Sequence, residues 1–97
     1  MASGSVKTVG GAWGAVQSIS FPFSPTKDGV VVGFVAPSTS SASYLYITDD
    51  GAAYVRGSST AGSSFGFSFP AKAGHKYAIS ASSNIGTNSA YKFVPFA

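Results

Sequence analysis

The sequence predicts an all-β domain, an antiparallel β-sandwich of the jelly-roll kind with about seven or eight strands. Helix formers are scarce, because the 97 residues include one Leu and no Glu. Runs of β-branched and aromatic residues alternate with polar ones at the two-residue period of a strand. Turns of Gly, Ser, Pro and Asp separate these runs at intervals of about ten residues, which favours a sandwich.

Composition predicts a single folded domain over residues 1–97, with residues 1–13 as a loose N-terminal arm. Hydrophobic types make up 44% of the chain and charged types only 9%, against an ordinary charged share of about 25%. The chain has no Cys, so no disulfide supplements its core. In so small a domain, contacts between subunits are a common source of further buried surface.

The formal charge of +3 is the difference between three Asp residues and six Lys and Arg residues, and the basic residues are scattered singly along the chain. A protein surface that binds nucleic acid usually carries a cluster of Lys and Arg side chains, so no nucleic-acid partner is expected. The first five residues lack the basic start and the apolar region of a signal peptide. No apolar run approaches the roughly 20 residues of a membrane span. We therefore expect synthesis in the cytoplasm and no membrane insertion.

The first expected strand covers residues 16–23 and buries Ile19, Phe21 and Phe23 on one face. The second, residues 30–36, is apolar on both faces, which is unusual for an antiparallel strand with one wet side. Two interpretations stay open for its outer face: a covering loop, or contact with another subunit.

The segments 44–48 and 52–56 form the clearest hairpin pattern in the chain. A three-residue loop of Asp49, Asp50 and Gly51 suits a type I turn followed by a left-handed residue. It would pair Ala53 with Ile47, Tyr54 with Tyr46, Val55 with Leu45 and Arg56 with Tyr44. A two-residue Asp50-Gly51 loop would mix the polar and apolar faces, because a one-residue slip turns a strand over. The three-residue loop is therefore preferred.

The remaining expected strands follow the same alternation. Residues 65–69 place three Phe rings on the core face, and residues 77–81 turn Tyr77, Ile79 and Ala81 inward. The closing strand contains Pro95, which has no N–H for a ladder hydrogen bond. We expect that strand to end at an edge of its sheet.

No catalytic or cofactor site is predicted. His75 is the only His, no nucleophile-elbow motif accompanies it, and a lone imidazole is too little for a zinc site, so it is interpreted as a solvated turn residue. Asp49 and Asp50 are interpreted as turn residues that face water, without the ligand number that Ca²⁺ usually requires. We therefore expect a protein that is not an enzyme and that carries no cofactor and no metal.

The aromatic residues are the strongest candidates for binding. In the expected register Tyr44, Tyr46, Tyr54 and Arg56 form one surface opposite the core, and Tyr and Arg are common in binding hot spots. Three interpretations stay open: cross-strand pairs that stabilise a solvent-facing sheet, a subunit interface, and a ligand face, for instance for sugars. Trp13 is a candidate for stacking on a sugar ring or for plugging the core.

Four segments carry a family resemblance over about two-thirds of the chain: Asp-Gly-Val-Val-Val at 28–32, Tyr-Leu-Tyr-Ile at 44–47, Phe-Pro-Ala-Lys-Ala-Gly-His-Lys-Tyr at 69–77 and Phe-Val-Pro-Phe at 93–96. Together they resemble small β-sandwich modules of phage and prophage tail-fibre or tail-tip proteins. The resemblance implies a homotrimer in the virion that contacts a bacterial surface glycan or protein receptor and has no catalytic residues. The alternative is a monomeric carbohydrate-binding or adhesin-like module.

Overall fold

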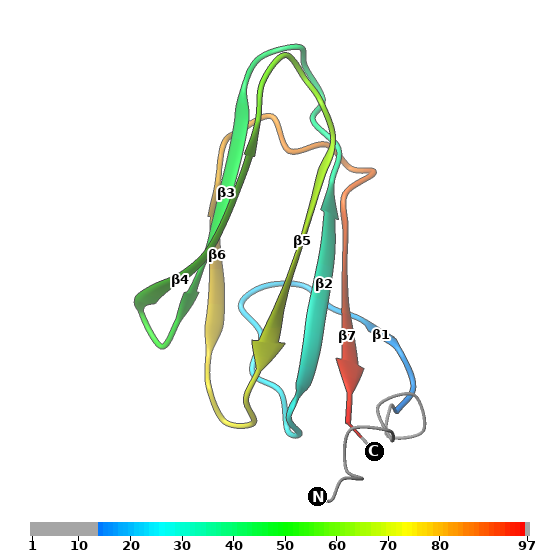
Figure 1. Cartoon of the computed structure of the whole chain (residues 1–97), viewed down its shortest axis with the longest axis vertical. Coiled ribbons are helices and arrows are strands. Elements are labelled where there is room, and N and C mark those ends of the chain that lie inside the picture. The colour runs from blue at the N-terminus through cyan, green and yellow to red at the C-terminus, as the bar shows by residue number, and fades with distance from the viewer. Residues whose placement is uncertain (1–13, 97) are drawn as a thin grey trace, which may run out of the picture.

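The computed structural model describes residues 14–96 and places seven strands in two antiparallel sheets (Figure 1). The strands are β1 (Gln17–Ser18), β2 (Gly29–Val35), β3 (Ser43–Asp49), β4 (Ala52–Ser59), β5 (Phe65–Ala71), β6 (Tyr77–Ala81) and β7 (Ala90–Pro95). One sheet has the order β1-β7-β2-β5 and the other has the order β4-β3-β6. The described residues contain no helix, so the predicted all-β class is confirmed. The expected arm at residues 1–13, and with it Trp13, lies outside the described residues.

One hydrophobic core joins the two sheets. Its buried members are Val31, Val35, Phe69, Ala71 and Phe93 from the first sheet, with Leu45, Ile47 and Tyr77 from the second. The Phe rings of β5 lie on the core face, as the alternation predicts: Phe69 is 2% exposed, while Phe65 and Phe67 pack against the core. The sheets therefore present their other faces in opposite directions, away from this shared core.

The expected first strand is only partly a strand. Gln17 and Ser18 pair with β7, and the chain then crosses so that Phe23 forms an isolated bridge with Tyr77 of β6. Pro22 follows Phe21 and has no N–H to continue a ladder. Ile19, Phe21 and Phe23 still pack against the core, so the predicted apolar face is correct although the strand is short.

Strand β2 is an inner strand between β7 and β5. Val31 and Val35 are buried, whereas Val32 is 39% exposed and Phe34 is 47% exposed on the outer face. A covering loop was one expected explanation for this two-sided apolar pattern. The described residues leave Val32 and Phe34 open.

The predicted hairpin register is wrong. The loop has two residues, Asp50 with φ 49° and Gly51 with φ 89°, and this pair of positive φ angles is that of a type I′ turn. Asp49 pairs with Ala52 and Thr48 with Ala53, but Ile47 pairs with Val55, so the register shifts by one residue at a β-bulge. The bulge reconciles the favoured Asp-Gly turn with an inward-facing Val55, and the alternation of residue types does not reveal it.

The expectation that the closing strand ends at a sheet edge is also wrong. Strand β7 lies between β1 and β2, and Pro95 pairs with Gly29 of β2. The missing N–H is tolerated because β1 pairs with β7 only at Lys92 and Phe93. On that side the Pro95 carbonyl accepts a hydrogen bond from the Gly14 N–H at 2.6 Å.

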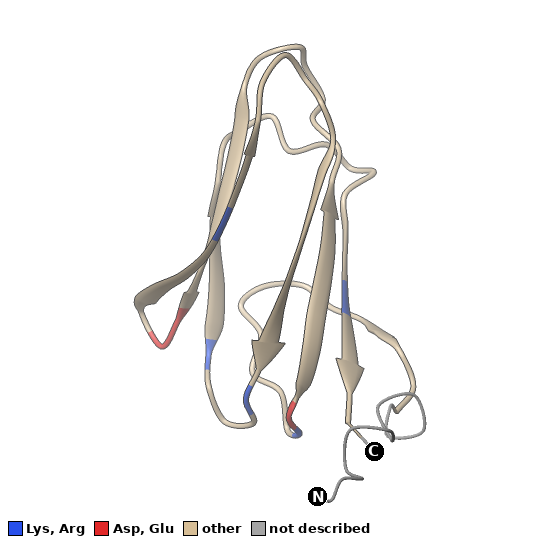
Figure 2. Ribbon diagram, viewed as in Figure 1, with Lys and Arg blue, Asp and Glu red and all other residues tan. Residues whose placement is uncertain are grey.

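Charged residues gather toward one end of the sandwich. Figure 2 shows them along the lower half of the strands and in the turns there, while the loops at the upper end have none. The three loops at that end, residues 36–42, 60–64 and 82–89, consist of Ser, Thr, Asn, Gly, Ala, Pro and Ile. The two ends of the molecule therefore differ in chemistry.

Candidate functional site

Tyr44, Tyr46 and Arg56 line a pocket of about 490 Å³ on the outer face of the β4-β3-β6 sheet, together with Leu45, Gly57 and Ser58. Alternation along β3 turns Leu45 and Ile47 into the core and so turns Tyr44 and Tyr46 outward. The bulge sets Arg56 directly opposite Tyr46. We call Tyr44, Tyr46 and Arg56 the Tyr-Arg pocket.

The two Tyr rings of the pocket are nearly parallel to each other. Their centroids are 6.3 Å apart and their planes differ by only 16°, a spacing close to the rise of two residues along a strand. Tyr44 is 50% exposed and Tyr46 is 37% exposed. Because the rings already lie in place, a flat ligand could pack on them with little ordering of the protein.

The guanidinium of Arg56 is available for a ligand. The ion pairs found in residues 14–96 join His75 to Asp49 and Asp50, and none involves Arg56. The remaining acid, Asp28, accepts a hydrogen bond from the Ala73 N–H at 2.9 Å. A free guanidinium offers planar donors that suit carboxylate and phosphate groups.

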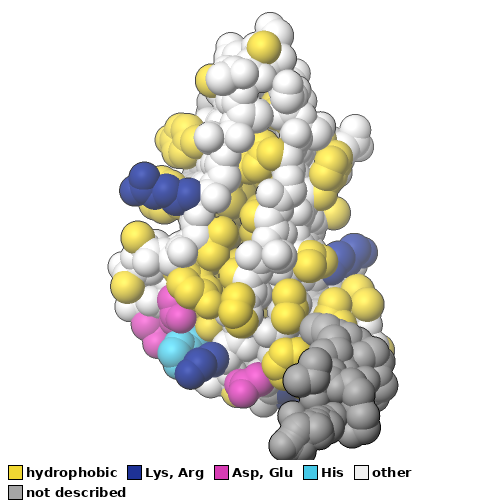
Figure 3. Space-filling view, in the orientation of Figure 1, with side chains coloured by type: hydrophobic (Ala, Val, Ile, Leu, Met, Phe, Trp, Pro, Cys, Tyr) yellow, Lys and Arg dark blue, Asp and Glu magenta, His cyan; other side chains and the backbone are white. Residues whose placement is uncertain are grey.

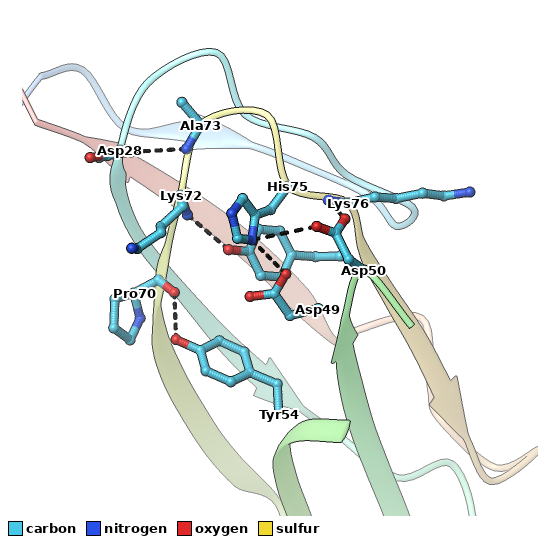
Figure 4. A network of polar contacts seen from close by, with 10 residues as sticks. Asp28, Asp49, Asp50, Tyr54, Pro70, Lys72, Ala73, His75 and Lys76 are labelled. Atoms are coloured by element: carbon cyan, nitrogen blue, oxygen red, sulfur yellow. Dashed lines mark hydrogen bonds and ion pairs between the residues drawn. The ribbon is translucent and has the colours of Figure 1, made fainter. Parts of the chain in front are cut away.

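Tyr54 does not belong to this surface, contrary to the prediction. Its ring lies 5.5 Å from Phe69 and 6.2 Å from Tyr77, two core residues. Its hydroxyl donates a hydrogen bond of 2.9 Å to the Pro70 carbonyl (Figure 4). The bulge at Tyr54 removes it from the alternation that governs Tyr44 and Tyr46, so it closes the edge of the core.

A second group of polar side chains, the Asp-His cluster, consists of Asp49, Asp50 and His75 (Figure 4). His75 Nδ1 lies 2.7 Å from Asp49 Oδ1 and 3.7 Å from Asp50 Oδ2. Sequence reasoning missed this cluster because 26 residues separate Asp49 from His75. His75 lies beside the turn at residues 73–74 and its side chain is 39% exposed, as predicted for a solvated turn residue, but its ring is also paired with a carboxylate. Antiparallel pairing of β3 with β6, which sets Asp49 opposite Tyr77, is the cause.

Tyr77 lies beneath the cluster and is fully buried. Burial raises the pKa of its hydroxyl, the hydrogen bond from the Lys72 N–H lowers it, and the Asp49 carboxylate raises it further. Burial also raises the pKa of Tyr91. Both phenols are therefore held in their neutral forms.

An apolar groove of about 490 Å³ crosses the outer face of the β1-β7-β2-β5 sheet, lined by Gly14, Val16, Val30, Val32 and Val94. A further groove continues it past Phe34, Ala90 and Lys92. In the view of Figure 3, further hydrophobic side chains reach the surface along the middle of the molecule, between the two sheets of Figure 1, with charged ones toward its margins and lower end. We call Val16, Val30, Val32, Phe34 and Val94 the valine face.

Within residues 14–96, no helix has the length and apolar character that crossing a membrane requires. Comparison of the chain with protein-family models, with curated proteins and with solved structures found no match.

Proposed function

We propose that this chain is a non-enzymatic, virion-associated module of a phage or prophage tail that contacts the bacterial surface as a homotrimer. The observation that carries the proposal is the Tyr-Arg pocket, in which a guanidinium without an ion-pair partner among residues 14–96 adjoins two nearly parallel Tyr rings. A receptor-binding module of this kind needs an open site for a molecule on the cell surface, and the Tyr-Arg pocket is open to solvent.

The pocket suits an anionic glycan for two physical reasons. The C–H groups on one face of a sugar ring carry partial positive charge and attract the negative face of an aromatic ring. A carboxylate or phosphate on the same glycan would accept charge-assisted hydrogen bonds from Arg56. Tyr44 and Tyr46 would supply the stacking area, and Arg56 would select the acidic sugar.

The valine face supports assembly of identical copies. Val16 is 61% exposed and Phe34 is 47% exposed, and the one charged side chain in these grooves, Lys92, donates a hydrogen bond to Ser18. A contiguous apolar face on a small domain marks an association surface. A second copy is the partner that is always present at matching concentration. Three copies is the number that the resemblance to tail-fibre modules implies.

The two surfaces have separate tasks in this proposal. They belong to different sheets that face away from a shared core. Copies that associate through the valine face would therefore leave the Tyr-Arg pocket open, and several pockets on one particle would raise the avidity for a cell surface.

A glycan array tests the receptor function. Wild-type protein should bind glycans that carry carboxylate or phosphate, and Arg56→Gln should lose at least about tenfold in affinity, because hydrogen bonds to charged groups contribute about 1.5–3 kcal/mol. Lys27→Gln is the matched control, since it removes one positive charge from an exposed loop residue that lines neither the Tyr-Arg pocket nor the grooves of the valine face. Failure of the wild type to bind any acidic glycan, or unchanged binding by Arg56→Gln, would contradict the proposal.

A second candidate is a monomeric carbohydrate-binding or adhesin-like module. The observation in its favour is that one chain supplies every residue of the Tyr-Arg pocket. Both candidate functions predict binding of acidic glycans, but they predict different masses for the protein in solution. A monomer that binds acidic glycans would favour the second one.

A further inference from the structure

We propose that the Asp-His cluster is a binding site for a divalent transition metal ion of the zinc class. Asp49 and Asp50 would supply one carboxylate oxygen each and His75 would supply Nδ1. The ion would join the β3-β4 turn to the β5-β6 connection. This inference is independent of the proposed receptor function.

The distances in the cluster are close to those that a metal requires. Zinc binds nitrogen and oxygen ligands at about 2.0–2.2 Å in a tetrahedron, which sets ligand atoms about 3.4 Å apart. His75 Nδ1 is 2.7 Å from Asp49 Oδ1 and 3.7 Å from Asp50 Oδ2, and the three ligand atoms all lie within 4.8 Å of one another. Side-chain rotations that change the separations of the ligand atoms by at most about 1.5 Å would therefore complete the geometry.

The backbone holds Asp50 in position for this role. The Asp50 N–H donates to the Lys76 carbonyl at 2.8 Å, and the Lys76 N–H donates to Asp50 Oδ1 at 2.7 Å. This reciprocal pair leaves Oδ2 directed toward His75. Such hydrogen bonds to a ligating carboxylate orient it for the metal. In Figure 4 the Lys76 side chain extends away from the cluster, so its ammonium does not occupy the site.

The imidazole is oriented as well. The His75 ring stacks on the buried Tyr77 ring at 6.3 Å with an interplanar angle of 18°. The His75 N–H donates to the Lys72 carbonyl at 3.2 Å. Fixed stacking limits the rotations that would carry Nδ1 away from the carboxylates.

The mixture of ligands selects the class of ion. An imidazole nitrogen suits zinc, copper, nickel and iron, whereas calcium and magnesium prefer oxygen ligands alone. His75 and Asp50 have side chains that are 39% and 57% exposed, so water could complete the coordination sphere. Three protein ligands with an open fourth position is an arrangement that zinc accepts.

Calorimetric titration of the full chain with Zn²⁺ alone, after treatment with a chelator, tests the inference. We expect saturable binding of one Zn²⁺ per chain. His75→Gln and Asp49→Asn should each weaken it at least about tenfold, because loss of a second-shell partner alone costs about 10- to 100-fold. Amide resonances of the two connections should shift together in NMR spectra of the wild type.

Asp28→Asn is the matched control, since Asp28 lies outside the cluster and should leave zinc binding unchanged. Asp50→Asn keeps the proposal testable if the other variants fold poorly, because Asn-Gly also favours a type I′ turn. It too should weaken binding. Absence of saturable zinc binding, equal binding by His75→Gln, or equal affinity for Ca²⁺ would overturn the proposal.

Discussion

Tyr54 illustrates at the residue scale how one inserted position changes the role of a side chain. Its neighbours on the expected surface, Tyr46 and Arg56, line a pocket, while Tyr54 rests against Phe69 and Tyr77. Residue type alone could not separate them, because all are large side chains with a polar end. The bulge decides which Tyr serves the core and which serves the surface.

The hydroxyl of Tyr54 should contribute modestly to stability. Tyr54→Phe removes the hydrogen bond to the Pro70 carbonyl. We expect a loss of about 0.5–1 kcal/mol in the free energy of unfolding, because the residue is 43% exposed and water can replace part of the bond. Urea unfolding measures the loss. Tyr44→Phe is the control, since its hydroxyl has no described partner among residues 14–96, and an equal loss there would contradict the assignment.

The raised pKa of Tyr77 predicts the pH dependence of stability. The folded state holds the phenol neutral above its ordinary pKa of 10.0, mainly through burial, so the unfolded state loses this proton first as pH rises. The contribution of the Tyr77 hydroxyl to the free energy of unfolding is therefore fully present below about pH 10. It is lost as the pH rises from there to the pKa of the folded state. Urea unfolding between pH 8 and 11.5 measures the fall. Stability that rises above pH 10 would contradict the assignment.

At the scale of strands, the two-residue alternation of apolar and polar residues predicts which face of a strand is buried, but it does not predict the register between strands. The inward rows of Phe65, Phe67 and Phe69 followed from alternation, as did the apolar face around Ile19. Register depends on turn type and on bulges. The alternative turns and bulges differ in free energy by only a few kcal/mol. With a two-residue Asp50-Gly51 turn, a regular ladder would mix the polar and apolar faces. A single bulge removes that conflict.

Strand pairing predicts an asymmetry between two glycines. A Cβ at Gly29 would collide with the Val94 carbonyl oxygen and the Phe93 ring, so Gly29→Ala must push β7 away from β2. We expect a loss of about 2–3 kcal/mol in the free energy of unfolding. At Gly66 the nearest atom is the Gly33 carbonyl oxygen at 3.3 Å, so Gly66→Ala should cost less than about 1 kcal/mol. Equal losses in urea unfolding would contradict this pairing.

At the scale of the whole molecule, the candidate site was only partly predictable. Tyr44, Tyr46 and Arg56 come from one hairpin, so local alternation brought them onto one surface. The Asp-His cluster joins segments far apart in the chain, and it depends on β3 pairing with β6. That pairing is a property of topology, which strand periodicity does not reveal.

The valine face predicts that assembly is sensitive to one buried charge. Val32→Glu places a carboxylate at the centre of the proposed contact, where desolvation is costly, while the chain itself should stay folded because Val32 is 39% exposed. We expect this variant to be a monomer in light scattering. Thr60→Glu adds the same charge in an exposed loop and should leave the mass unchanged. If both variants were monomers, general charge repulsion and not the valine face would explain the loss of assembly.

The mass of the wild-type chain in solution tests the central claim most directly. The claim is that the valine face is covered by further copies of the chain while the Tyr-Arg pocket stays open. Light scattering at micromolar concentration should give about 29 kDa, three chains of 9.8 kDa each. A mass of 9.8 kDa for the wild type would contradict the account and favour a monomeric carbohydrate-binding module.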